Sequence, residues 1–301
     1  MYKMKIGKIG EFGLIERFKK AIKTDSSVIK GSGDDCAVLK FDKDNYLLFT
    51  CDMLVEDVDF KHNESPYLIG RKALAVSVSD IAACSGLPRY SLVSLGIPKN
   101  TSVEAIDKIF KGIRNIADKY KINIVGGDIS KAKQLILEVS VLGIVEKKNL
   151  TLRSGAKKGD IIFVTGKLGG SIRGKHLKFT PRIREARFLV ENFKVNSMID
   201  ISDGLTQDLG HILKQSQVGA IIYEQLIPLS SQAHNLKDAL YMGEDFELLF
   251  TLERRQARKL SKRGLTDFKP IGEITDKKYS LRLVDKIGKE KIIKPKGFQH
   301  F

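Results

Sequence analysis

The chain of 301 residues contains no tryptophan, only three cysteines and only five histidines. The cysteines, Cys36, Cys51 and Cys84, lie far apart and form no CxxC pair, and no histidine-rich segment accompanies them. This spacing excludes the usual zinc-binding patterns and provides no disulfide framework. We therefore expect a protein of a reducing compartment, the cytoplasm.

Long hydrophobic runs are also missing. No apolar run reaches the roughly 18 to 20 residues that a membrane-spanning helix needs. Residues 1–12 carry charge but are not followed by the apolar stretch of a secretory signal peptide. With 42% hydrophobic residues the chain can still bury a sizeable core, so we expect a soluble globular protein that is neither membrane-bound nor secreted.

The chain has few acidic residues relative to basic ones. It contains 36 acidic residues and 52 lysines and arginines, which gives a net charge of +16. The excess is concentrated in residues 253–301, which hold fifteen basic and six acidic residues. A nucleic-acid-binding protein would show such a charge, but no recognition motif accompanies it here. We interpret the charge as a solvated basic surface whose field also steers anionic substrates, and we expect no nucleic-acid partner.

Helical periodicity and short β-branched runs are mixed along the chain. Apolar residues recur at helical spacing over 12–22 and 103–120, where Thr101 and Glu104 have capping-box spacing. Further helices are predicted from Thr180 as N-cap, with Pro181 at the first position, and over 253–264, closed by Gly264. The predicted strands are 46–50, 122–125, 135–145, 161–165, 219–223 and 246–251.

This mixture has no strict alternation of strand and helix, which favours a mixed α/β or α+β fold over a doubly wound parallel sheet. The polar segment 146–158 separates two apolar runs. We place a domain boundary there, near residue 150, which divides the chain into domains of residues 1–150 and 151–301.

Five short stretches place aspartates at the ends of apolar runs. They are Gly33-Asp34-Asp35, Thr50-Cys51-Asp52, Ser79-Asp80, Gly126-Gly127-Asp128 and Asp200-Ile201-Ser202-Asp203-Gly204. A single aspartate after a strand is usually a turn or a helix cap, but five such sites favour a common role. Converging carboxylates repel one another unless cations compensate them or some stay protonated. An all-oxygen set without His or Cys clusters favours Mg²⁺ over zinc.

Glycines beside these aspartates indicate bound phosphate, a frequent companion of Mg²⁺. Gly126-Gly127 leaves backbone N–H groups accessible next to Asp128. The turn Asp203-Gly204 precedes a predicted helix, whose N-terminus can bind an anion. A helix cap explains this turn equally well.

The common nucleotide-binding motifs are absent or broken. Residues 169–175 have the spacing of a Walker A loop, but His176 stands where a Ser or Thr would bind Mg²⁺. Residues 31–33 lack the third glycine of a dinucleotide loop, and no protein-kinase catalytic loop is present. A nucleotide site in this chain must therefore be of another kind.

Eight stretches, read in order, resemble one family. They are GEFGLI (10–15), GDDCAVL (33–39), TCDMLVEDVDF (50–60), KALAVSVSDIAA (72–83), VGGD (125–128), RSGAKKGD (153–160), IDISDGL (199–205) and GEDFELLF (243–250). The chain resembles the thiamine-monophosphate kinases over nearly its whole length, and some motifs recur in aminoimidazole ribonucleotide synthetase and selenophosphate synthetase. The resemblance implies an N-terminal α/β domain whose strands build a barrel across a homodimer interface. It also implies a C-terminal α/β domain that covers the nucleotide.

The resemblance implies roles for individual residues. Positions matched to Mg²⁺ ligands are Asp35, Thr50, Cys51, Asp52, Asp80, Asp128, Asp200 and Asp203. Positions matched to ATP contacts are Gly127, Asp128, Arg153 and Ser202, and positions matched to thiamine-phosphate contacts are Asp59, Glu244 and Phe298. From the residues alone, Arg153 also fits a surface turn, Glu244 a strand edge and Phe298 the core.

The chain departs from the family pattern at Cys51, at Asp59, at Ile129, which stands where a threonine is common, and in the stretch 167–181, which is shorter than usual. Cys51 replaces a threonine, which is compatible with a metal contact through the main-chain carbonyl but not through sulfur. Asp59 replaces a histidine that faces the substrate. Its negative charge would repel the substrate phosphate unless a metal, Lys61 or His62 compensates it.

The implied reaction converts ATP and thiamine phosphate into ADP and thiamine diphosphate. A phosphate monoester has a second pKa of about 6, so its attacking oxygen is ionised at neutral pH and direct in-line transfer needs no catalytic base. Catalysis would come from positioning and from Mg²⁺ ions shared by Asp52, Asp80 and Asp128. The alternatives are a synthetase of the same superfamily with another acceptor, and a nucleotide- or nucleic-acid-binding protein without ATP turnover.

Overall fold

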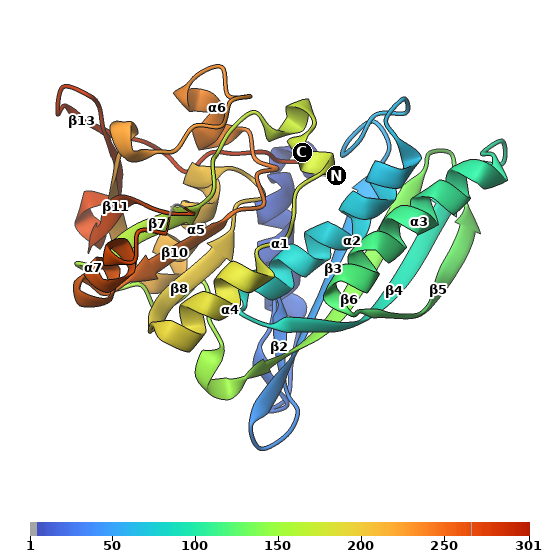
Figure 1. Ribbon diagram of the computed structural model, residues 1–301, viewed down its shortest axis with the longest axis horizontal. Helices are drawn as coiled ribbons and strands as arrows, with labels where there is room; N and C mark the ends of the chain where they lie inside the picture. The colour runs from blue at the N-terminus through green and yellow to red at the C-terminus, as the bar shows by residue number, and fades with distance from the viewer. Residues whose placement is uncertain (1–4, 266) are drawn as a thin grey trace.

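The computed structural model describes residues 5–265 and 267–301. In this part of the chain, seven α-helices and two β-sheets form a mixed α/β fold (Figure 1), which confirms the predicted fold class. The helices are α1 (Gly10–Ala21), α2 (Pro66–Ala83), α3 (Val103–Tyr120), α4 (Ile183–Asn192), α5 (Leu205–Ser216), α6 (Leu236–Tyr241) and α7 (Arg254–Lys262). None of these helices has both the length and the apolar character needed to cross a membrane.

The first sheet contains six strands in the order β1-β2-β3-β6-β4-β5. Their bounds, in that spatial order, are Val28–Lys30, Ala37–Lys40, Asn45–Val55, Ile136–Glu146, Leu87–Ile97 and Asn123–Lys131. All neighbours are antiparallel except β4 and β5. Every second residue along β6 is buried, because α2 and α3 cover one face of the sheet (Figure 1). On the other face, Phe49, Met53, Tyr90 and Leu92 are exposed.

The second sheet contains seven strands in the order β13-β12-β9-β11-β7-β10-β8. Their bounds, in that order, are Glu290–Ile292, Leu281–Val284, Val218–Tyr223, Phe268–Asp276, Ile161–Thr165, Leu248–Leu252 and Val195–Asp200. Side chains of one face pack with α4 and α7, and side chains of the other face pack with α5 and α6. The core on the α4 and α7 face continues into the core around α2, so the two sheets share one apolar core.

Helix α2 joins the two sheets because it is buried on nearly all sides. Thirteen of its residues are buried, and it packs against β3, β6 and α3 as well as against α4 and β8. A helix that is apolar all round has no amphipathic period, which is why the sequence periodicity does not predict it. Strand β4 is also missing from the prediction, because Pro88 and Gly96 weaken its strand pattern.

Two of the predicted helix starts are wrong by one or two residues. Thr101 closes a turn on the carbonyl of Pro98, so Ser102 caps α3 instead and accepts the N–H of Ala105. Helix α4 begins at Ile183 rather than at Pro181, whose carbonyl accepts the Tyr120 hydroxyl at 2.9 Å. At the end of α7, Gly264 has a φ of +65°, which supports its predicted role in closing the helix.

Helices α2 and α3 cross at two glycines. A Cβ on Gly70 would lie 1.9 Å from the carbonyl oxygen of Ile109, and a Cβ on Gly112 would lie 1.9 Å from that of Tyr67. No side chain fits at either position, so the absence of a Cβ sets how closely the two helices approach.

Replacing Gly112 by alanine should push α2 and α3 apart and lower the free energy of unfolding by about 1–3 kcal/mol. Gly7→Ala is the matched control, since no atom lies within 4 Å of the added methyl group. Chemical denaturation followed by circular dichroism measures both variants. Equal stability of the Gly112→Ala protein and the wild type would contradict this close crossing.

Candidate active site

Three aspartates from separate elements lie close together and are called here the aspartate cluster: Asp35, Asp80 and Asp200. Asp80 lies on α2, Asp200 ends β8, and Asp35 precedes β2. One carboxylate oxygen from each lies within 4.8 Å of the other two. Ser79 donates a hydrogen bond to Asp200 at 2.6 Å, and Thr50 donates one to Asp80. The structure thus brings together aspartates that are 45 and 120 residues apart in sequence.

The aspartate cluster contains more buried negative charge than its neighbours compensate. Burial raises the pKa of Asp200 to about 8. Burial and the nearby Asp52 raise the pKa of Asp80 well above its ordinary value, and burial raises the pKa of Asp52 itself to about 6. Arg153 provides positive charge, with its Nη2 atom 2.7 Å from Oδ1 of Asp35. The raised pKa values indicate that simultaneous ionisation of Asp52, Asp80 and Asp200 is unfavourable in the folded protein.

The donor atoms of this region fit a hard divalent cation. Asp35, Asp52, Asp80, Asp200 and Thr50 all offer oxygen, which is the donor that Mg²⁺ prefers. The Oδ2 atoms of Asp35 and Asp52 are buried and accept no hydrogen bond from the residues that the structure describes. A bound cation would supply both the missing contacts and the missing charge.

The side chain of Cys51 points away from the aspartate cluster. Successive residues of a strand face opposite sides of the sheet, and Thr50 and Asp52 both face the cluster side. The Cys51 thiol is therefore on the other side, where it is exposed. Only its main chain is left for a metal contact.

Gly127 and Asp128 also lie apart from the cluster, on the edge strand β5. The registers of the sheet align Asp52 with Val139, Val139 with Val93, and Val93 with Gly127. Three strand spacings correspond to about 14 Å. Gly127 has a structural reason to be glycine, because a Cβ there would lie 1.7 Å from the carbonyl oxygen of Val93.

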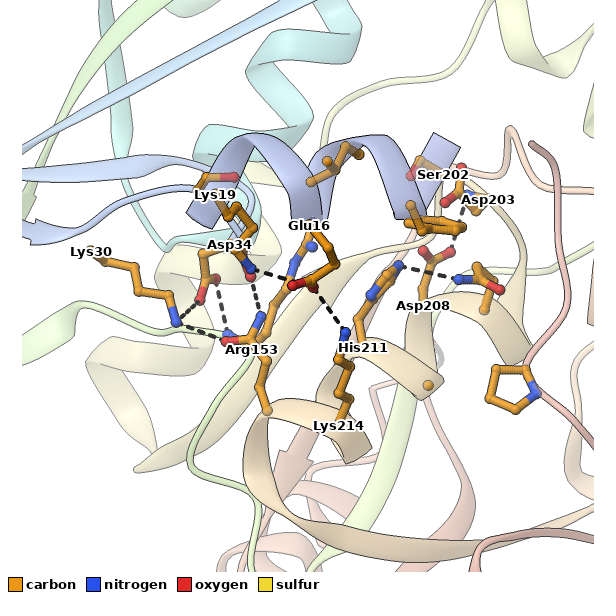
Figure 2. A pocket seen from close by; sticks show the side chains of 18 residues that line it. Glu16, Lys19, Lys30, Asp34, Arg153, Ser202, Asp203, Asp208, His211 and Lys214 are labelled. Carbon is orange, nitrogen blue, oxygen red and sulfur yellow. Dashed lines mark hydrogen bonds and ion pairs between the residues drawn. The ribbon is translucent and has the colours of Figure 1, made fainter. Parts of the chain in front are cut away.

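A cavity of about 660 Å³, called here the first cavity, lies between α1 and α5 (Figure 2). Three of the predicted site residues line it: Arg153, Ser202 and Asp203. Burial raises the pKa of Asp203 to about 6. The cavity wall also contains three lysines, Lys19, Lys30 and Lys214.

Two rings contact each other at a tilt of 60° in the wall of the first cavity. The centroids of Phe12 on α1 and His211 on α5 are 5.3 Å apart. Burial lowers the pKa of His211 to about 4, so this imidazole is neutral at physiological pH. The pair gives the cavity an apolar wall beside its charged one.

A second cavity of about 290 Å³ shares the Ser202–Asp203 turn with the first. All three residues predicted to contact thiamine phosphate line it: Asp59, Glu244 and Phe298. Asp52 also lines this second cavity, which therefore adjoins the region of the aspartate cluster. Phe60, Met242 and Phe246 supply apolar surface.

The backbone of the Ser202–Asp203 turn holds two loops of the second cavity. The N–H of Glu244 donates to the carbonyl of Ser202 at 2.7 Å, and the N–H of Phe298 donates to the carbonyl of Asp203 at 2.9 Å. A Cβ on Gly243 would lie 2.4 Å from the Ser202 carbonyl oxygen, and one on Gly297 would lie 2.3 Å from that of Asp203. The neighbouring glycines are therefore required for this close approach.

Lys72 is not among the site residues predicted from the sequence, but it contacts two of the predicted substrate residues. Its Nζ atom donates to Oε2 of Glu244 at 2.5 Å and to the carbonyl oxygen of Asp59 at 2.7 Å. The signal in the sequence is a lysine at the start of the apolar stretch KALAVSVSDIAA. It follows Ile69 by three residues and precedes Val76 by four, so all three share one face of a helix. Lysine is rarely buried unless it is paired.

The two side chains that are candidates for compensating the charge of Asp59, Lys61 and His62, lie in different places. Lys61 lines the second cavity. His62 instead contacts Glu56 at 2.5 Å, and its side chain is 88% exposed, away from the second cavity. The Asp59 carboxylate itself accepts the N–H of Val55 at 2.8 Å.

The segment with Walker A spacing does not form a phosphate loop. The N–H of Gly169 is occupied by the buried carboxylate of Asp245, at 2.9 Å from Oδ2. Lys175 donates to Glu247 at 2.9 Å rather than facing a cavity. This finding agrees with the expectation that any nucleotide site here is of another kind.

Comparison with known proteins places this geometry in a family. Models of the AIR synthase related proteins match residues 33–145 with their N-terminal domain and residues 130–284 with their C-terminal domain. The thiamine-monophosphate kinase of Buchnera aphidicola subsp. Schizaphis graminum (strain Sg) is 38% identical, over 97% of this chain and 98% of its own. The thiamine-monophosphate kinase of Bacillus subtilis (strain 168) is 34% identical, over 97% of this chain and 99% of its own. The structure of AaThiL complexed with AMPPCP and TMP matches with a TM-score of 0.87 and 30% identity, and covers all of both chains.

The two sheets around a buried aspartate cluster thus define a protein of the AIR synthase related class. Within this class, the chain belongs to the thiamine-monophosphate kinase family. The family predicted from the eight motifs is confirmed.

Replacing Asp200 by asparagine should stabilise the metal-free protein, because an amide removes the cost of burying this carboxylate beside two others. The folded wild type keeps a proton that the unfolded chain releases above pH 3.8, so this group lowers stability progressively as the pH rises to about 8. The gain in Tm should therefore be small near pH 4 and grow toward pH 8. Each kcal/mol added to the free energy of unfolding should raise the Tm by roughly 2–4 °C.

Differential scanning calorimetry in the presence of EDTA measures this difference at each pH. Asp276→Asn is the control, since this carboxylate lies at the surface and pairs only with Lys158 among the residues described. A lower Tm of Asp200→Asn than of the wild type at pH 8 would refute the interpretation.

Proposed function

We propose that this protein transfers the γ-phosphoryl group of ATP to thiamine monophosphate and releases ADP and thiamine diphosphate. The observation that carries the proposal is the arrangement of the two cavities, which share the Ser202–Asp203 turn and adjoin the aspartate cluster through Asp52. Ligands in the two cavities would meet at this turn. The related AaThiL, solved with AMPPCP and TMP, supports the same pair of ligands.

The second cavity has the chemistry that thiamine monophosphate requires. The thiazolium ring of thiamine monophosphate is a cation, which the carboxylates of Asp59 and Glu244 attract. Both rings of this ligand are aromatic and can pack against Phe60 and Phe298. Lys61 lines the same cavity and offers a positive charge for the phosphate group.

The first cavity suits a nucleotide. Arg153 and Ser202 are the proposed contacts to ATP, and the three lysines of the wall provide positive charge for its phosphates. Gly127 and Asp128 would contact ATP from β5, at the edge of the first sheet. We assign that contact to the homodimer described below, because β5 lies three strands from Asp52 within one chain.

The proposed site holds several Mg²⁺ ions. Their ligands would be Asp35, Asp52, Asp80 and Asp200, with Thr50 and Asp203 beside them, the carbonyl of Cys51, and Asp128 from β5. When bound, these ions neutralise the phosphate oxygens and stabilise the charge that develops during transfer.

The residues of the chain would act by positioning and by excluding water. A phosphate oxygen of thiamine monophosphate forms the new bond to the γ-phosphorus of ATP, while the bond from that phosphorus to the bridging oxygen of ADP breaks. The attacking oxygen is ionised at neutral pH, since its second pKa is about 6, so no residue has to remove a proton. Burial of Asp35 and Asp200 keeps water from the region and favours transfer over hydrolysis.

We also propose a homodimer that covers the open face of the first sheet. Phe49, Met53, Tyr90 and Leu92 are between 45% and 58% exposed on this face, and an apolar sheet face of this kind usually has a partner. Residues 1–150 would form the dimerising domain, and residues 151–301 the domain that covers the nucleotide. The three free cysteines suit a cytoplasmic protein.

The direct test is a chromatographic assay with ATP, Mg²⁺ and thiamine monophosphate. We expect thiamine diphosphate and ADP in equal amounts, and no product when thiamine replaces its phosphate ester. ATP binding without thiamine diphosphate would assign another acceptor within the same class. Salt-sensitive binding of nucleic acid without ATP turnover would refute an enzymatic function.

Asp80→Asn should lower kcat by at least about 100-fold, because several kcal/mol of transition-state stabilisation depend on the cations that Asp80 would hold. The surface variant Asp276→Asn should keep wild-type turnover. Steady-state kinetics at saturating Mg²⁺ measure both. Wild-type turnover by Asp80→Asn would remove this residue from the proposed machinery.

A further inference from the structure

Lys72 is one of the largest fully buried side chains among the described residues. Its exposed fraction is 0%, and its two hydrogen bonds lead to Glu244 and to the carbonyl of Asp59. Burying an ammonium group costs free energy unless partners compensate it. Here both partners belong to loops that line the second cavity, which connects this buried charge to ligand binding.

We propose that Lys72 is a positioning residue for the thiamine phosphate substrate, which holds the Glu244 carboxylate and the Asp59 loop in the geometry that binds the cationic ring. The inference rests on the proposed function, because it takes the second cavity as the thiamine phosphate site. Lys72 lies behind the wall of the cavity, and it acts through the two residues that it holds.

The loop of Glu244 needs such a restraint. Glu244 has a φ of 60° and Phe246 a φ of 49°, in the left-handed region that residues with a side chain rarely adopt. A backbone of this kind persists only where its surroundings hold it. Backbone hydrogen bonds to Ser202 and Ile201 hold the main chain, at 2.7 and 2.8 Å. Lys72 holds the side chain, whose exposed 24% faces the cavity.

The Asp59 loop is held at the same point. The N–H of Asp59 donates to the carbonyl of Val55 at 2.9 Å, and its Oδ2 accepts the N–H of Val55 at 2.8 Å. Asp59 is thereby folded back onto the end of β3, and Lys72 binds its carbonyl. One ammonium group therefore connects a loop of the first sheet to a loop of the second.

The position of Lys72 on α2 links this contact to the aspartate cluster. Lys72 and Asp80 are eight residues apart on one buried helix, which corresponds to about 12 Å along its axis. Val76, one turn from each, lines the second cavity. The helix thus sets the distance between the group that positions the cationic ring and a carboxylate of the cluster.

Lys72→Met tests the inference, because methionine is similar in length but carries no charge. We expect the KM for thiamine phosphate to rise about 10- to 100-fold, from the loss of hydrogen bonds to a charged group. The KM for ATP should stay unchanged. The rise in Tm that thiamine phosphate alone produces in the wild type should be lost.

The matched control is Arg187→Met. Arg187 pairs with Glu146 at 2.6 Å and donates to the carbonyl of Ser85 at 3.0 Å, so it also joins the two sheets, but it lines neither cavity. This variant should lower the Tm and leave the KM for thiamine phosphate unchanged.

A double-mutant cycle with Glu244→Gln keeps the inference testable if Lys72→Met alone folds poorly. The double variant buries no unpaired charge, so it should fold. If Lys72 acts through Glu244, adding Lys72→Met to Glu244→Gln should change the KM for thiamine phosphate far less than it does in the wild type.

Three results would overturn the inference: an unchanged KM for thiamine phosphate in Lys72→Met, an equal rise in the KM for ATP, or additive effects in the cycle. A wild type that makes no thiamine diphosphate would instead refute the proposed function. In that case the Tm shift by thiamine phosphate still decides the role of Lys72, since it reports binding without turnover.

Discussion

The burial of α2 between two sheets is the constraint on which the candidate site depends. This helix packs against the first sheet along one side and against α4 and β8 along another. Asp80 can therefore meet Asp200 from the second sheet, and Lys72 can meet Glu244. Gly70 and Gly112 add to this constraint, because they let α3 approach closely and cover α2. A shift of α2 would disturb both the aspartate cluster and the second cavity.

The aspartate cluster lowers the free energy of unfolding. Buried carboxylates with raised pKa values oppose folding at neutral pH. A core of the same size with apolar residues would be more stable. Among the described residues, nothing donates a hydrogen bond to Oδ2 of Asp35 or of Asp52, and a cation bound there would supply the missing contact. The wider surroundings, such as the shared apolar core, offset the cost.

The features that could be predicted from the sequence are those in which residue chemistry is local. Each aspartate of the cluster stands beside an apolar run, so the grouping of oxygen donors could be predicted before the fold was known. Helix α2 could not be predicted in this way, because a helix that is buried all round has no amphipathic period. Lys72 was not predicted because most lysines are exposed. The start of α4 was predicted two residues too early, since the carbonyl of Pro181 is bound by Tyr120 from a distant helix.

The sequence by itself determined the mixed α/β class, the oxygen-only character of the donor set and the family, because residue type and motif order carry that information locally. Only the tertiary structure decided that Asp35, Asp80 and Asp200 share one cluster while Gly127 and Asp128 lie three strands away. It also decided that Lys72 joins two loops of one cavity. These facts follow from the order of strands in the sheets and from the packing of α2, which are contacts between distant residues that no local pattern encodes.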